Sequence, residues 1–156
     1  MESGCSSRGI PVSLKQWEDN GWLKPEPPSR DEIQNLFVII ERDLKDSGES
    51  VSVDWQFGIA YNAALKLCTI LLRSEGYRPS HGNHHYRTIM SIPEILGHEW
   101  QDNAEYLNAC RTKRNTLEYD YAGCVTNEEV KELLDFLKGF RKEVKNWLEA
   151  NHPVLS

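Results

Sequence analysis

Apolar residues recur every three or four positions along most of this chain, and that spacing is typical of amphipathic helices. Alternation of apolar and polar residues, which would predict strands, is absent. Long helices are expected at about 29–48, 53–75 and 99–118 and from 126 onward, and short ones at 12–23 and 84–96. The pattern therefore predicts an all-α, up-and-down bundle of four to five main helices, with a short N-terminal helix and an inserted loop and short helix.

The expected helix ends carry residues that commonly begin or end helices. The candidates are Ser13, Ser29 or Asp31, Ser52, Gly76 as a C-cap, and the capping box Thr126-Asn127-Glu128-Glu129. Residues 1–28 are then a tail, a short helix and a proline-rich linker, 29–152 the bundle, and 153–156 a C-terminal tail. The helix at 53–75 is apolar on more than one side, so we expect it to lie at the centre.

Composition is that of an ordinary globular domain, with 39% hydrophobic and 27% charged residues in a chain of 156. The longest apolar runs are too short to cross a bilayer, and residues 1–7 lack the features of a signal peptide, so we expect a cytoplasmic protein without a membrane partner. The four cysteines show no C-x-x-C spacing. Cys68 and Cys110 fall at helical core positions, which favours reduced packing thiols.

A net charge of -6 argues against non-specific coating of nucleic acid, which relies on accumulated Lys and Arg. The acidic excess lies towards the two ends, however. Residues 73–114 hold four of the five histidines together with Arg73, Arg78, Arg87, Arg111, Lys113 and Arg114. One electropositive surface on an acidic protein is therefore conceivable. The strong motifs of NTPases, dehydrogenases, zincins and α/β-hydrolases are absent.

Arg114 falls on the apolar arc of the helix at 99–118, together with Ala104, Leu107 and Cys110. A guanidinium among core residues is costly unless a carboxylate or a bound anion satisfies it. Two interpretations stay open: an ion pair with a buried acid such as Asp54, or contact with an anionic ligand.

The segment from Arg78 to Arg87 is rich in histidine and arginine, and its three histidines lie within five positions. His81, His84 and His85 could ligate a metal if His98 or Glu99 joined them. They could also occupy a loop without a ligand, or form an anion-binding surface with the backbone N–H groups at a helix N-terminus. We favour the anion-binding interpretation and expect the segment to lie within reach of Arg114.

The stretch from Arg114 to Tyr121 resembles the signature of the HEPN (higher eukaryotes and prokaryotes nucleotide-binding) family. That signature is an Arg, usually followed by Asn, Asp or His, and then a His several residues later, often with a Tyr two places on. Here Arg114 and Asn115 match its opening, Tyr119 stands where the His belongs, and Tyr121 matches the downstream Tyr. The resemblance extends loosely over residues 29–150.

This resemblance implies a helical bundle whose Arg stabilises charge on the scissile phosphate of RNA, while the motif His transfers protons. Tyr119 departs from that pattern: a phenol with a pKa of about 10 is a poor base at pH 7, so ribonuclease activity is expected to be weak or absent. In one variant of the family the downstream Tyr accepts a nucleotidyl group. Tyr121 stands at that place, although it could equally pack the turn, and Asn115 could end the helix or contact a ligand.

The sequence thus predicts a HEPN-like protein that interacts with RNA or a nucleotide, of the kind found as toxin–antitoxin components or beside nucleotidyltransferases. The resemblance implies a homodimer, a nucleotidyltransferase as a further partner, and no cofactor or metal. The expected catalytic pair is Arg114 and Tyr119, and the expected binding residues are Arg78, His84, His85, Arg87, Arg111, Asn115 and Tyr121. A non-catalytic protein-interaction bundle and a hydrolase with a metal on the histidine loop are the alternatives.

Overall fold

The computed structural model describes residues 12–49, 52–119 and 125–156, without the side chains of residues 12–13 and 116–119. The elements in chain order are α1 (Val12–Asp19), β1 (Leu23–Pro25), α2 (Arg30–Glu49), α3 (Val53–Ser74), β2 (Tyr77–Pro79), α4 (His84–Met90), α5 (Ile92–Leu96), the 3-10 turn η1 (His98–Trp100), α6 (Gln101–Tyr119) and α7 (Asn127–Asn151).

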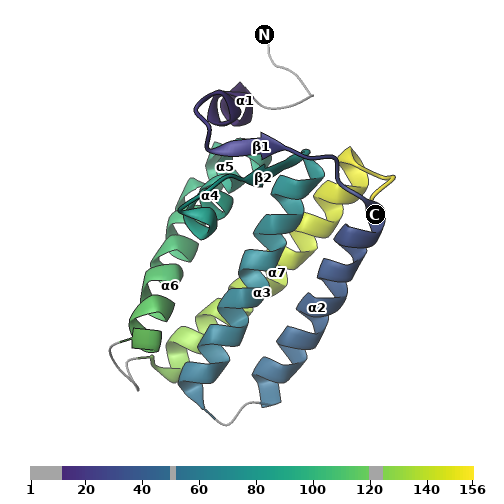
Figure 1. Ribbon diagram of the computed structural model, residues 1–156. Coiled ribbons are helices and arrows are strands. Elements are labelled where there is room, and N and C mark those ends of the chain that lie inside the picture. Colours follow the sequence, from purple (N-terminus) through teal and green to yellow (C-terminus); the bar gives the residue numbers. More distant parts are fainter. Residues whose placement is uncertain (1–11, 50–51, 120–124) are drawn as a thin grey trace.

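The predicted all-α bundle is confirmed (Figure 1). The long helices α2, α3, α6 and α7 run up and down side by side, and α3 packs against each of the other three. Because it has neighbours on several sides, α3 contributes the largest share of the buried residues. These include Phe57, Ala60, Tyr61, Ala63, Ala64, Leu67, Cys68, Ile70 and Leu71. Cys68 and Cys110 are free, buried thiols, as the sequence predicts.

The caps of the long helices follow the sequence closely. Ser29 Oγ accepts a hydrogen bond from the Glu32 N–H at 3.2 Å, which selects Ser29 rather than Asp31 as the cap of α2. Ser52 Oγ accepts from Trp55 N–H at 3.3 Å, and both halves of the capping box at the start of α7 are formed. The C-cap of α3 is Glu75 instead of Gly76, which follows it with φ 90°. This left-handed conformation suits a glycine after the cap.

The N-terminal segment differs from the expectation. The first helix ends at Asp19 rather than near residue 23, and it already begins at Val12, so Ser13 is not its cap. Leu23–Pro25 forms the short strand β1, which pairs antiparallel with β2. Leu23 is buried in a second small core with Leu14, Leu72 and Tyr77, so the segment is packed onto the end of the bundle.

Arg73, near the end of α3, fastens this segment to the bundle. Its Nε and Nη2 donate to the two carboxylate oxygens of Glu32 at 2.8 and 3.1 Å. Its Nη1 donates to the carbonyl oxygens of Glu26 and Tyr77 at 3.0 and 3.1 Å. Arg73 is only 5% exposed, so these partners replace the water that its charge would otherwise need.

The predicted short helix at 84–96 is divided into α4 and α5 at Ser91. Pro93 lies in the first turn of α5, where its missing N–H is tolerated but where it cannot continue the hydrogen bonding of α4. Over the described part of the chain, no helix is long and apolar enough to cross a membrane.

Candidate functional site

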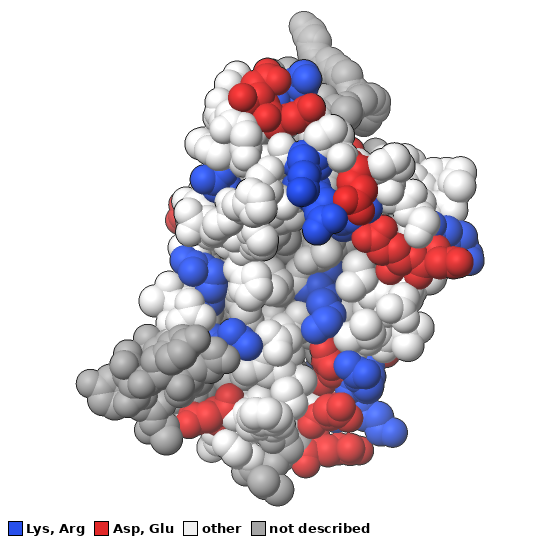
Figure 2. Space-filling model, in the orientation of Figure 1, with Lys and Arg blue, Asp and Glu red and all other residues white. Residues whose placement is uncertain are grey.

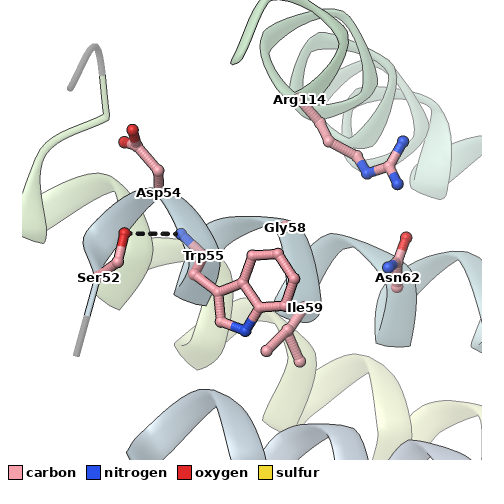
Figure 3. A pocket seen from close by; sticks show the side chains of 7 residues that line it. All are labelled: Ser52, Asp54, Trp55, Gly58, Ile59, Asn62 and Arg114. Atoms are coloured by element: carbon pink, nitrogen blue, oxygen red, sulfur yellow. Dashed lines mark hydrogen bonds between the residues drawn. The ribbon is translucent and has the colours of Figure 1, made fainter. Parts of the chain in front are cut away.

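An open pocket of about 590 Å³ lies between the N-terminal half of α3 and the C-terminal half of α6 (Figure 3). It is lined by Ser52, Asp54, Trp55, Gly58, Ile59, Asn62 and Arg114. The other lining residues belong to α3 or its cap, and among them Trp55, Gly58 and Asn62 recur at three- or four-residue spacing along one face of the helix. Among the residues whose side chains are described, Arg114 is the one that reaches across from α6.

Arg114 is half-buried on the side of α6 that faces α3. Its guanidinium carbon is 5.6 Å from the centroid of the Tyr61 ring, a cation–π distance. Asp54 also lines the pocket, but its carboxylate and the guanidinium of Arg114 point in different directions (Figure 3). The guanidinium extends towards Asn62.

Tyr61 is the buried residue whose ring contacts both Arg114 and His85. It is 0% exposed, and its hydroxyl has no hydrogen-bond partner among the described residues. Burial raises the pKa of this phenol well above its usual range, so it stays neutral. The ring therefore acts as an aromatic platform that supports Arg114 rather than as a proton donor.

His85, in the first turn of α4, lies against the same ring, with 6.3 Å between the two centroids. Partial burial lowers the pKa of His85 below its usual value, and the nearby charges of Arg114 and Arg111 lower it further. A neutral imidazole at pH 7 can accept a hydrogen bond or a proton. The structure thus brings Arg111, Arg114 and His85 together.

Arg111 lies one helical turn before Arg114 on α6. Its guanidinium carbon is 5.8 Å from the Tyr86 ring centroid, and its Nε donates to Asn108 Oδ1 at 2.9 Å. The packing of α4 against α6 thus puts α4 residues beside the basic side of α6.

The other predicted basic residues lie elsewhere. Arg78, on β2, donates to Glu26 at 2.8 Å, and Arg87 lies 4.0 Å from the Trp22 ring centroid. Both side chains contact residues of the N-terminal segment, so we do not place them in the group around Arg114. His84 is exposed at the start of α4 and lines a smaller pocket beside His85.

The remaining motif residues divide as follows. Asn115 is exposed and does not line the pocket. Tyr119 is the last residue of α6, and its side chain is not described. Tyr121 lies outside the described residues.

The histidine segment shows no arrangement suited to a metal. Within the described part of the chain, no three His, Cys, Asp or Glu side chains gather at metal-binding distance. His81, His84, His85 and His98 are all among the residues searched. This geometry gives the metal-hydrolase alternative no support.

Charge is distributed unevenly over the surface (Figure 2). The face over α4 and α6 carries basic side chains separated by uncharged ones, whereas acidic side chains gather over α1, along α2 and at the opposite end of the bundle. Such a local excess of positive charge can attract an anion to an acidic protein.

Trp55 and Asn62 line the pocket, but they are not among the binding residues expected from the sequence. The sequence carried one signal for Trp55, a large aromatic residue outside the apolar set of its helix. In the structure its side chain is 65% exposed. Asn62 gave no such signal, because its role depends on how α6 packs against α3.

Comparison of the chain with models of known families, with curated proteins and with solved structures found no match.

Proposed function

We propose that this chain is a HEPN-like protein that binds RNA or a nucleotide through a phosphate group held at Arg114, with weak or absent ribonuclease activity. The observation that supports it best is the gathering of Arg111, Arg114 and His85 beside an open pocket. The sequence motif that begins at Arg114 points to the same residue.

The chemistry of the site suits a phosphate. A guanidinium offers a planar fork that can donate two hydrogen bonds to phosphate oxygens. The guanidinium carbon lies over the aromatic ring of Tyr61, and this cation–π contact helps to hold the side chain in place. Arg111 adds a second positive charge one turn away, and a neutral His85 can accept a hydrogen bond from a ribose hydroxyl.

Efficient cleavage needs more than a phosphate-binding cation. A group that titrates near pH 7 is best suited to take the proton of the 2′-hydroxyl. In the motif that group is a His, and in this chain Tyr119 stands in its place. The chain then acts by binding, as a cytoplasmic homodimer and as a component of a toxin–antitoxin or nucleotidyltransferase pair.

Binding of a fluorescent single-stranded RNA, measured by anisotropy, tests this proposal. Replacing Arg114 by Gln should weaken binding about 10- to 100-fold, the loss expected for hydrogen bonds to a charged group. Arg141→Gln is the control, because Arg141 pairs with Glu41 on the surface and lies on α7, which contributes nothing to the pocket. Equal affinity in both variants, or no RNA or nucleotide binding by the unmodified protein, would contradict the proposal.

A non-catalytic module that binds a protein is the second candidate, and the exposed Trp55 favours it. Exposed aromatic residues beside a pocket often anchor protein partners. In that case nucleotides and RNA would not bind, and Arg114→Gln would leave the anisotropy unchanged.

A further inference from the structure

We propose that the pocket between α3 and α6 holds one nucleoside phosphate unit, with its base stacked on Trp55 and its phosphate at Arg114. This inference rests on the proposed function and adds the residue that recognises the base.

The two ends of the pocket differ in chemistry. Trp55 and Asn62 are seven residues apart on α3, which corresponds to about 10 Å along the helix axis. The indole lies towards one end, and the guanidinium of Arg114 points to Asn62 at the other (Figure 3). A ligand with a flat aromatic part and a separate anionic part matches this arrangement, and a nucleotide has both.

Trp55 is placed to stack. It is 65% exposed, although tryptophan is among the largest apolar side chains. It borders a pocket that is also lined by the guanidinium of Arg114 and the amide of Asn62. Its backbone N–H donates a hydrogen bond to the N-cap residue, at Ser52 Oγ, over 3.3 Å, which helps to hold the backbone at the start of α3. Every base has a π-face, so an exposed indole can stack on it without strong sequence preference.

Gly58 leaves the floor of the pocket open between these two ends. A Cβ at this position would meet nothing within 4 Å, and the residue has no positive φ that would require glycine. Glycine inside a helix costs about 1 kcal/mol relative to alanine. A larger side chain should therefore fill the pocket and leave the fold intact.

The same face of α3 continues into a second pocket of about 220 Å³, which Leu65, Thr69, His84 and His85 help to line. Leu65 and Thr69 follow Asn62 at helical spacing, so the two pockets lie along one side of the helix. A single-stranded RNA could extend from one into the other, whereas a free nucleotide would occupy only the first.

Titration calorimetry of UMP, AMP and a six-nucleotide single-stranded RNA tests the proposal. Trp55→Ala should weaken binding about 5- to 100-fold, the usual loss for one stacked base, and Trp55→Phe should retain most of the affinity. Val38→Ala is the control, because Val38 is 66% exposed but lies on α2 outside the pocket. Tighter binding of the six-nucleotide RNA would identify RNA as the source of the ligand, and equal affinity would identify a free nucleotide.

Gly58→Leu provides a variant that blocks the pocket. It should abolish binding while the melting temperature stays level or rises, whereas Gly139→Leu, at an equally open glycine on α7, should bind normally. If Arg114→Gln loses binding but Trp55→Ala and Gly58→Leu retain it, the base position is wrong and the proposed function stands. If neither RNA nor nucleotide binds, both proposals fail.

Discussion

The guanidinium of Arg114 lies over the ring of Tyr61, with 5.6 Å between its central carbon and the ring centroid. Because Tyr61 is completely buried in α3, this contact connects a cation on the surface of α6 to the centre of the core. His85 from α4 rests against the same ring. Residues from α3, α4 and α6 therefore meet at one aromatic ring.

The first prediction concerns His85. Its imidazole should titrate below about pH 6.5, the value of an unperturbed histidine, as measured by NMR. Arg114→Gln and Arg111→Gln should each raise the pKa of His85, because removing a positive neighbour makes the protonated ring less costly. Arg141→Gln should leave it unchanged. A pKa that does not respond to either site variant would place His85 away from the arginines.

The second prediction concerns Arg73. Arg73→Met should lower the free energy of unfolding by about 2 to 3 kcal/mol in urea titrations. This is less than the 3 to 5 typical of a fully buried pair, because Glu32 keeps contact with water. Arg78→Gln at the same end should have a much smaller effect, since its pair with Glu26 is exposed. Similar losses of unfolding free energy in both variants would show that burial of Arg73 does not determine how much it stabilises the fold.

The long helices could be predicted from the sequence because each carries its own apolar period and cap. Thr126 and Glu129, for example, form both hydrogen bonds of the capping box that their spacing predicts. The strands could not be predicted in this way. They contain three residues each, and β1 is held by pairing with Tyr77–Pro79, more than fifty positions away in the chain.

The site was predicted only in part, for a similar reason. The helical period places Arg111 and Arg114 on the inner side of α6, and the structure agrees. Arg78 and Arg87 are directed elsewhere by Glu26 and Trp22, partners that only the folded N-terminal segment supplies. Which face of α3 meets α6 is likewise a property of packing, so Asn62 could not be selected from the sequence.

The third prediction concerns chemistry. The purified protein should cleave RNA weakly or not at all without metal, and Tyr119→His should raise any trace activity more than Arg114→Lys does. The new imidazole would supply acid–base assistance, which is typically worth about 10² to 10⁴ in rate, whereas Lys loses the planar fork of Arg. Gel assays with a labelled RNA measure this. Robust cleavage by the unmodified protein would mean that a group other than Tyr119 transfers the proton. His85→Asn would then be the first variant to test.

The fourth prediction concerns assembly. Sedimentation should show a dimer at micromolar concentration, built on faces that include α6, so that Arg111 and Arg114 border a groove between subunits. Asn115→Arg should shift the protein to a monomer, because Asn115 is exposed on α6 one helical turn after Arg111. Asn151→Arg, at an exposed asparagine of α7, is the matched control. A monomeric unmodified protein would remove the dimer from the account.

The central claim is that a nucleotide or RNA binds between α3 and α6, and an amide chemical-shift map recorded during titration with single-stranded RNA tests it most directly. The largest changes are expected at Trp55, Asn62 and Arg114, and little change is expected around Gly139 on α7. Changes confined to α2 and α7, or no changes at saturating RNA, would contradict it.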